Sequence, residues 1–429
     1  MKPGHQDFLH SLVDYERTVG YNYDLDVYKK FLDHVGAPQK KLNNVILIGG
    51  TKGKGSTAEI LAASLMNNGH RVGIYTSPHL TRMNERIKVN GKEISDSDLD
   101  RYAAMLRPLM HKKTGARSFF EALTTIAFLY FLEQHVDFTL LEVGLGGRLD
   151  ATNASDPLIS VITRIGYDHT NLLGSTLSGI TTEKAGILRE HRTLITIHQR
   201  PVVERVLASI AAKKGNKIIF ADDQCAIRIL EQSIRGSSII INGSMGDIRT
   251  HLPLTGAHQI ENLSIALAVL SELKSAGFLL EPRKIALGIE HTQLRGRFEV
   301  ISERPLIIFD CCHNGDSFRA LERNLDLFNI DDFFLIFGSN RDKDIQYCLK
   351  NIFPRAREVL LVKADNPRAI EPGKLHRQAS KHQRNIILAD SVGNALDLLR
   401  MRNVRTLPII IAGSFYLWPL DKDGRLTST

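Results

Sequence analysis

Short apolar runs rich in β-branched residues alternate along this chain with amphipathic stretches of helical length. The run Val45-Ile46-Leu47-Ile48 ends in two glycines, and the stretch from Ser56 to Asn68 then carries apolar residues at helical spacing before Gly69. Such a pair predicts a buried strand followed by a helix that ends near Gly69. The same reading gives strands over residues 71–75, 138–143 and 160–165, and a helix over residues 119–134. This alternation predicts an α/β fold with a mostly parallel sheet covered by helices on both faces.

The pattern changes between about residues 217 and 248. Three β-prone runs, residues 217–220, 226–230 and 238–241, follow one another with no room for helices between them. This spacing predicts a small antiparallel insertion, after which a helix resumes over residues 259–275.

Strand–helix alternation restarts after Arg297. The strand-like runs are residues 306–310, 333–337, 359–362, 386–388 and 407–411. Together they supply enough material for a second, smaller α/β domain. We therefore predict two domains, residues 1–296 and 297–429.

Composition narrows the class of protein. Of the 429 residues, 43% are hydrophobic and 24% charged, which excludes a disordered chain, a collagen or a coiled coil. No run approaches the ~18 apolar residues of a membrane span. Four cysteines without a CxxC pair, and an N-terminus without the apolar core of a signal peptide, lead us to expect a reducing cytoplasm.

The chain is basic, with 55 Lys and Arg against 47 Asp and Glu, a net charge of +8. Neither a dense basic tract nor a basic-aromatic stripe accompanies this charge, so we expect no nucleic-acid partner. A generally solvated basic surface and a preference for small polyanionic substrates both remain open.

The sharpest local motif is Gly49-Gly50-Thr51-Lys52-Gly53-Lys54-Gly55-Ser56-Thr57, between the first strand and its helix. Glycines let backbone N–H groups wrap around phosphate oxygens, and a helix N-terminus favours negative charge. Lys54 could reach the outer phosphates, and Ser56 or Thr57 could bind Mg²⁺. The motif is not a strict Walker A sequence, because Gly55 separates Lys54 from Ser56. A glycine-rich turn with incidental lysines is the alternative.

Two further polar clusters follow strands that we predict. Glu142 ends the run Phe138 to Val143, at the sheet edge where α/β proteins bind ligands, so it could hold a metal near the phosphates or cap a helix. His169 follows the run that ends at Ile165, and could bind a metal or phosphate or be structural. Lys184 lies on an amphipathic stretch that would stop at Gly186. Nothing in the local sequence distinguishes it from an ordinary helical lysine.

Polar residues also follow a predicted strand later in the chain. Asp310 and His313 lie at the end of the predicted strand from Leu306 to Phe309. The adjacent cysteines Cys311 and Cys312 lack a second pair at zinc spacing, which favours ordinary packed thiols over metal ligands.

Taken in order, these segments resemble the folylpolyglutamate synthase / dihydrofolate synthase family within the Mur ligase superfamily. The resemblance spans about residues 40–418. It rests on blocks similar to the family's GTNGKGS, YTSPHL, NERI, YFE, EVGLGGRLDATN, DHT and EKAG motifs, which are residues 50–56, 75–80, 84–87, 119–121, 142–153, 168–170 and 183–186. Residues 258–262, 296–297, 342–344, 366–369 and 412–417 complete the set.

The resemblance implies a P-loop-type ATPase domain followed by a Rossmann-like domain, and an ATP-dependent ligase that joins L-glutamate to dihydropteroate or to folates through an acyl phosphate. It implies ATP and Mg²⁺ as cofactors and a monomer. Catalytic roles fall on Lys54, His169 and Lys184, the last as a carbamylated lysine. The implied ATP contacts are Thr51, Lys52, Gly53, Lys54, Gly55, Ser56, Thr57, Asn262, Arg297 and Asp310. The implied Mg²⁺ ligands are Ser56, Glu142 and His169. The implied substrate contacts are Ser77, Pro78, His79, Phe120, Glu121, Asp150 and Ala151 on the pterin side, and His313 and Ser414 on the glutamate side.

The chain departs from the family pattern at several positions. Lys52 stands where Asn is usual, Arg295 where Pro is usual, and Cys311-Cys312 where Gly-Ala is usual. These departures leave two alternatives open: a Mur-type ligase with another carboxylate acceptor, and a nucleotide-binding protein that has lost ligase activity.

Overall fold

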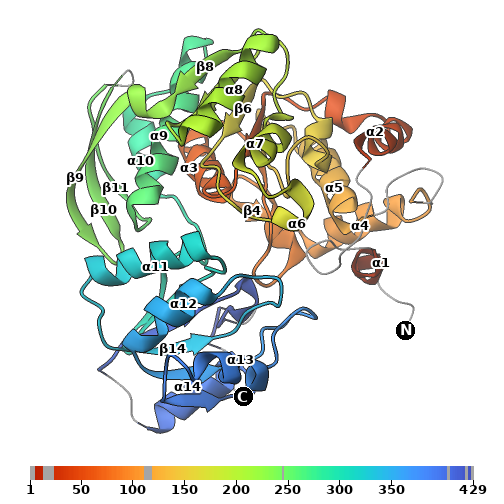
Figure 1. Cartoon of the computed structure of the whole chain (residues 1–429). Helices are drawn as coiled ribbons and strands as arrows, with labels where there is room; N and C mark the ends of the chain where they lie inside the picture. The colour runs from red at the N-terminus through yellow and green to blue at the C-terminus, as the bar shows by residue number, and fades with distance from the viewer. Residues whose placement is uncertain are drawn as a thin grey trace.

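The computed structural model of the chain describes residues 5–12, 24–110, 118–243, 246–402, 406–420 and 424–426 (Figure 1). Its strands form three sheets, of eight, three and six strands. Within these described ranges, no helix is both long and apolar enough to cross a membrane.

The eight-stranded sheet has the order β4-β3-β2-β5-β1-β6-β7-β8. Strands β2, β5, β1, β6, β7 and β8 are parallel, and the hairpin β3–β4 adds an antiparallel edge. The mostly parallel sheet that the alternation predicts is confirmed. The strands are β1 (Val45–Gly49), β2 (Val72–Tyr75), β3 (Ile87–Val89), β4 (Lys92–Glu93), β5 (Phe138–Glu142), β6 (Ile159–Ile162), β7 (Thr193–Thr196) and β8 (Lys217–Phe220).

Helices cover both faces of this sheet because its central strands are apolar on both sides. In β1, Val45 and Leu47 enter one core, whereas Ile46 and Ile48 enter the other. The first core receives α1 (His5–Ser11), α2 (Leu25–His34), α4 (Asp96–Leu106), α5 (Phe119–Glu133), α7 (Leu177–Ala185) and α8 (Pro201–Lys213). The second receives α3 (Lys54–Asn67), α9 (Ala257–Ser275) and α10 (Pro282–Glu290). The short helix α6 (Thr170–Leu173) follows β6 in the chain.

The antiparallel insertion is smaller than the sequence predicts. It contains β9 (Cys225–Ser233), β10 (Gly236–Gly243) and β11 (Ile248–Leu252), and its isoleucines pack into the second core. The assignment of residues 217–220 to it is wrong, because β8 pairs parallel with β7. Helix α8 already completes the crossover between these two strands, so β8 extends the large sheet. We call the eight-stranded sheet, its helices and this insertion the N-terminal unit.

The six-stranded sheet lies below the N-terminal unit in Figure 1 and has the order β12-β13-β17-β14-β15-β16. Only β12 is antiparallel. Its strands are β12 (Glu299–Glu303), β13 (Leu306–Asp310), β14 (Phe333–Phe337), β15 (Ala356–Leu361), β16 (Ile386–Leu388) and β17 (Ile409–Ala412). With α11 (Gly315–Leu327), α12 (Gln346–Asn351), α13 (Pro372–Ala379) and α14 (Val392–Met401) it forms the C-terminal unit. The domain boundary at residue 296 stays a prediction.

Short 3₁₀ helices occur in the connections of both units. They are η1 (Pro38–Lys40), η2 (Met83–Arg86), η3 (Ala151–Ala154), η4 (Ala221–Asp223), η5 (Phe353–Arg355) and η6 (Phe415–Leu417).

Candidate active site

A cavity of about 1560 Å³ is lined by residues of both units. Most of the candidate residues line it: Thr51, Lys52, Gly53, Lys54, Gly55, Ser56, Ser77, Pro78, Phe120, Glu121, Glu142, Asp150, Ala151, His169, Asn262, Arg297, Asp310, His313 and Ser414. Thr57, His79 and Lys184 are not among its lining residues. The fold therefore brings most of the sequence candidates into one space.

The glycine-rich loop connects β1 to the N-terminus of α3. Gly50 and Gly53 have φ of +142° and +89°. A Cβ atom on Gly50 would lie 1.9 Å from Thr163 Oγ1, and one on Gly53 would lie 2.0 Å from Asn262 Oδ1. Only glycine fits at either position. The loop therefore brings its backbone to the cavity beside the first turn of a 14-residue helix, an arrangement suited to a phosphate.

Three contacts from outside the loop fix its backbone. Thr163 Oγ1 donates to the Lys52 carbonyl at 2.7 Å, and Thr51 N donates to the Arg164 carbonyl at 2.9 Å. Lys184 Nζ donates to the Gly50 carbonyl at 2.8 Å. Sequence reasoning missed Thr163, since a threonine near a strand end has no distinguishing local pattern.

Lys184 is not the ordinary surface lysine that its local sequence indicates. Only 6% of the residue is exposed, at the C-terminal end of α7 beneath the loop. Burial, together with the nearby Lys54, lowers the pKa of Lys184 to about 7. A substantial fraction of this amine is therefore unprotonated at neutral pH.

Glu142 is the last residue of β5 and lies against the start of α3. Its Oε2 accepts a hydrogen bond from Ser77 N at 3.1 Å, and its Oε1 lies 3.9 Å from Lys54 Nζ. Burial raises the pKa of Glu142, and Lys54 opposes that rise. These partners place the carboxylate beside the glycine-rich loop, and its role as a metal ligand stays a prediction.

The loop that carries His169 is longer than the sequence predicts. Strand β6 ends at Ile162, not at residue 165, because Thr163 and Arg164 leave the sheet to bond the glycine-rich loop. His169 has φ +49° and precedes α6. Its side chain is 43% exposed, and partial burial lowers its pKa while Asp168 opposes that shift. The unprotonated imidazole can then act as a metal ligand.

The expected acceptor side of the cavity contains two carboxylates that already have partners. Asp150 Oδ2 accepts from Gly144 N at 3.1 Å and from Leu145 N at 2.9 Å, and its Oδ1 accepts from Thr152 N. Glu121 Oε2 accepts from Ser118 N at 2.9 Å in a capping box. These acids hold loops in place, and the ring of Phe120 supplies an apolar wall.

His79 is not among the lining residues of the cavity. Its Nδ1 accepts a hydrogen bond from Arg86 Nε at 2.8 Å, and Arg86 itself lines the cavity. The arrangement makes His79 a support for Arg86.

The C-terminal unit closes the other side of the cavity. Asp310, at the end of β13, accepts from Phe298 N at 3.0 Å and from Cys312 N at 2.8 Å. The Arg297 guanidinium lies 5.2 Å from the centre of the Phe415 ring. Ser414 Oγ accepts from Tyr416 N at the start of η6.

Cys311, Cys312 and His313 follow β13. Both cysteines are fully buried, and burial raises the pKa of each thiol. His313 Nδ1 lies 2.9 Å from the Cys311 carbonyl oxygen. Nothing in this arrangement gathers the two thiols with a second pair of metal ligands.

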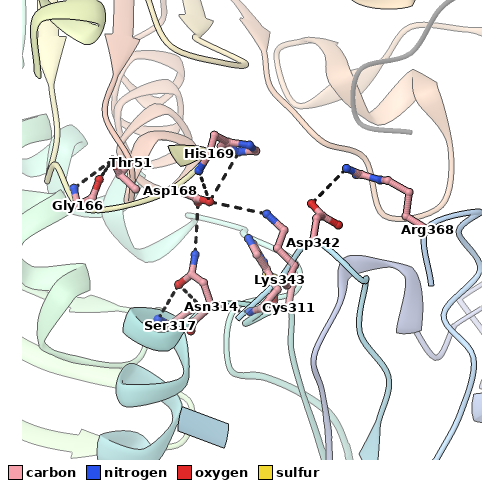
Figure 2. Close-up of polar contacts among 11 residues, drawn as sticks. Thr51, Gly166, Asp168, His169, Cys311, Asn314, Ser317, Asp342, Lys343 and Arg368 are labelled. Atoms are coloured by element: carbon pink, nitrogen blue, oxygen red, sulfur yellow. Dashed lines mark hydrogen bonds and ion pairs between the residues drawn. The ribbon is translucent and has the colours of Figure 1, made fainter. Parts of the chain in front are cut away.

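Asp168, Asn314 and Lys343 form a junction between the units that sequence reasoning did not assign to the site. Asn314 Nδ2 donates to Asp168 Oδ2 at 3.3 Å, and Lys343 Nζ lies 3.7 Å from Asp168 Oδ1 (Figure 2). Lys343 lies in a block, residues 342–344, that carries part of the family resemblance, and this was the available signal.

Two sequence models of Mur ligase domains match the chain. The Mur ligase middle domain matches residues 48–270, and the Mur ligase glutamate ligase domain matches residues 296–415.

Similar proteins include enzymes of known name. The chain is 32% identical to the dihydrofolate synthase/folylpolyglutamate synthase of Bacillus subtilis over 80% of this chain and 81% of that protein. It is 30% identical to the folylpolyglutamate synthase of Lacticaseibacillus casei over 94% and 97% of the two chains. A relative in Haloferax volcanii, a probable bifunctional folylpolyglutamate synthase/dihydropteroate synthase, is 28% identical over 94% of this chain, which spans only 50% of that relative's length.

Solved structures agree in fold over nearly the whole chain. The Mycobacterium tuberculosis folylpolyglutamate synthase complexed with ADP and AMPPCP has a TM-score of 0.84, 28% identity and 96% coverage of both chains. The E. coli FolC structure in complex with DHPP and ADP has a TM-score of 0.83 and 28% identity, and covers 97% of this chain and 96% of that one.

Proposed function

Because the chain belongs to the folylpolyglutamate synthase / dihydrofolate synthase family of Mur ligases, we propose that it joins L-glutamate to the carboxyl group of dihydropteroate, of a folate, or of both, while ATP is converted to ADP and phosphate. One observation carries the proposal for this chain. The glycine-rich loop, Glu142 and the apolar wall at Phe120 line the same cavity, which the C-terminal unit closes.

The reaction has two steps in this proposal. An oxygen of the acceptor carboxylate attacks the γ-phosphorus of ATP, forming an acyl phosphate as the bond to ADP breaks. The amine of glutamate then attacks the acyl carbon, phosphate leaves, and the nitrogen loses a proton. Phosphoryl transfer depends mainly on positioning and on neutralising charge. Loop N–H groups and Lys54 would hold the phosphates, and closure by the C-terminal unit would exclude water.

The residues beside the loop fit a magnesium ion. Among the described residues, no group of three or more His, Cys, Asp or Glu side chains is placed to hold a metal. Mg²⁺ does not need such a cage, because it commonly takes one or two protein ligands together with phosphate oxygens and waters. Ser56, in the first turn of α3, and Glu142, at the end of β5, are both buried, and His169 lines the same cavity. When bound there, the ion would neutralise phosphate charge.

Lys184 is proposed to carry a carbamate. A neutral lysine amine can attack CO₂, forming an N–C bond and releasing one proton, and burial favours the neutral amine here. The resulting carboxylate would lie under the glycine-rich loop, where it would orient the metal site.

The remaining candidate residues are assigned either to the nucleotide or to one of the two substrates. Asn262, Arg297 and Asp310 are proposed to contact ATP, together with Thr51, Lys52, Gly53, Gly55 and Thr57 of the loop. Ser77, Pro78, Phe120 and Ala151 would contact the acceptor, and His313 and Ser414 glutamate. Glu121, Asp150 and His79 are also proposed on the acceptor side, where their polar atoms bond loops or Arg86 as well.

We further propose a two-domain monomer that divides near residue 296, acts in a reducing cytoplasm and binds no nucleic acid. The four cysteines, all free, suit that compartment. Measuring the size of the protein in solution tests whether it is a monomer. A DNA-binding assay at low salt tests whether it binds nucleic acid.

The decisive experiment offers the purified protein Mg-ATP and L-glutamate with dihydropteroate, a reduced folate or a cell-wall nucleotide precursor in separate reactions. Mass spectrometry then identifies the product. A gain of one glutamate on dihydropteroate or on the folate supports the proposal and identifies the acceptor. Gain only on the cell-wall precursor would identify another Mur-type ligase. ATP binding without any product would indicate a protein that has lost ligase activity.

A further inference from the structure

Asp168 joins the two units through a single carboxylate. Its Oδ1 lies 3.7 Å from Lys343 Nζ, in the loop after β14, and its Oδ2 accepts a hydrogen bond from Asn314 Nδ2 at 3.3 Å. Asn314 is the N-cap of α11, and its own Oδ1 accepts from Ser317 N at 3.1 Å. The cap therefore orients the Asn314 amide nitrogen toward Asp168, as Figure 2 shows.

The ion pair between Asp168 and Lys343 is shielded from water. The two side chains are only 17% and 14% exposed. A shielded pair is screened less by salt than a surface pair and holds its geometry better.

The same carboxylate controls the backbone that presents His169. Its Oδ1 accepts a hydrogen bond from His169 N at 3.0 Å, and His169 has the unfavourable left-handed φ of +49°. A non-glycine residue keeps such a conformation only when its surroundings hold it. Asp168 therefore bonds the strained turn and the C-terminal unit at once.

This loop is also bonded to the glycine-rich loop. Gly166 N donates to Thr51 Oγ1 at 3.1 Å, and Thr51 Oγ1 donates to the Gly166 carbonyl at 3.2 Å (Figure 2). Polar contacts thus run from α11 and Lys343 to Asp168 and His169, and the backbone of residues 166–168 connects Asp168 to the contacts between Gly166 and the glycine-rich loop.

We propose that Asp168 is a positioning residue that couples the placement of the C-terminal unit to the conformation of the loop carrying His169 and, through Gly166, to the glycine-rich loop. The catalytic consequence rests on the proposed function, whereas the coupling itself does not. The C-terminal unit would then complete the site only when Asn314 and Lys343 engage Asp168.

The test uses Asp168→Asn, Lys343→Met and the double variant. Asn at 168 can still accept from His169 N but carries no charge for Lys343, and Lys343→Met leaves the His169 loop unaltered. We expect each single variant to lower kcat about ten-fold, because each removes one partner of a shielded ion pair. The fall in kcat should exceed any rise in the KM for ATP. The double variant should resemble Asp168→Asn, because that change already removes the charge that faces Lys343 and also replaces the oxygen that accepts from Asn314 Nδ2.

A readout independent of catalysis follows the distance between the units. Lys213, at the end of α8, and Lys381, after α13, are exposed and can be replaced by cysteine for spin labelling. Cys225 is replaced by serine, and the other three cysteines are buried. Pulsed EPR should give a narrow distance distribution in the parent. Asp168→Asn and Lys343→Met should broaden or shift it, and Lys343→Arg should restore it.

The matched control is Asp326→Asn, which removes an exposed ion pair with Arg355 inside the C-terminal unit and should change neither readout. Unchanged distances in both single variants, or losses that add in the double variant, would overturn the proposed coupling. A parent protein without ligase activity would refute the proposed function but leave the EPR result to decide the coupling.

Discussion

At the scale of single residues, burial gives several side chains properties that their sequence context does not reveal. Lys184 lies in an amphipathic stretch like any helical lysine, yet the fold places its amine under the glycine-rich loop. Its low pKa also has a consequence for stability. The folded protein releases the Lys184 proton near pH 7, whereas the unfolded chain keeps it to about pH 10.5. The unfolded state therefore binds more protons between these values, and stability should rise with pH across that window.

We predict that Lys184→Met flattens this pH dependence. The wild-type slope attributable to Lys184 is at most about 1.4 kcal/mol per pH unit. Urea unfolding of both proteins between pH 7 and 10, in buffer free of CO₂, measures it. Parallel curves for the two proteins would contradict a buried neutral amine.

Lys184→Ala should fold normally but lose most of the rate in the ligase assay. Unchanged turnover would remove the carbamate assignment.

Glu142 gives a second prediction at this scale. Glu142→Gln removes the charge but keeps the shape, so Mg²⁺-dependent activity should fall far more than the stability of the free protein. Titration of the ligase rate with Mg²⁺, beside thermal unfolding of both proteins, checks this. A large loss of stability with an unchanged Mg²⁺ requirement would make Glu142 a structural acid.

Lys52 is the departure from the family pattern that lies within the glycine-rich loop itself. Burial lowers its pKa to about 8, although Asp168 favours the charged form, and the residue lines the cavity beside Lys54. A second cation there should strengthen ATP binding. Lys52→Asn is expected to raise the KM for ATP about ten-fold, as for a lost charge-assisted contact. Lys52→Arg is the charge-preserving control, and equal KM values in all three proteins would argue against the role.

At the scale of elements, the sequence predicts what local pattern determines. The strand at residues 45–48, the glycine-rich loop and the helix after it follow from apolar runs and glycine spacing, and all are confirmed. The partner of a strand is not a local property, so residues 217–220 could not be assigned to the large sheet. The early end of β6 depends on Thr163, whose partner lies 111 residues away in sequence.

The candidate site divides in the same way. Positions such as Glu142 and Asp310 follow from their places at strand ends. The implied substrate role of Glu121 was drawn from family resemblance, whereas its hydrogen bonds place it in the capping box of α5.

Helix α5 supplies the prediction at this scale. Ser118 Oγ accepts from Glu121 N, and Glu121 Oε2 accepts from Ser118 N. Ser118→Ala should therefore destabilise the protein by about 1 kcal/mol through loss of the cap. Urea unfolding measures this change, with the exposed Ser97→Ala as control. A loss no larger than that of the control would show that the cap contributes little.

At the scale of the whole molecule, two consecutive units line one cavity around a basic loop. The net charge of +8 suits anionic substrates such as ATP, a pteroate carboxylate and glutamate. The family resemblance indicated both halves of this cavity. The contacts of Asp168 with Asn314 and Lys343 could not be anticipated, because they depend on how the units meet.

The central claim is that the chain activates a carboxylate by phosphorylating it. The most direct measurement uses an acceptor whose carboxylate is labelled with oxygen-18, incubated with the protein, Mg-ATP and glutamate, and follows the label by mass spectrometry. An acyl phosphate requires one labelled oxygen to leave with the phosphate, so we expect labelled inorganic phosphate in step with the amide product. Amide formation with the label absent from phosphate would contradict it.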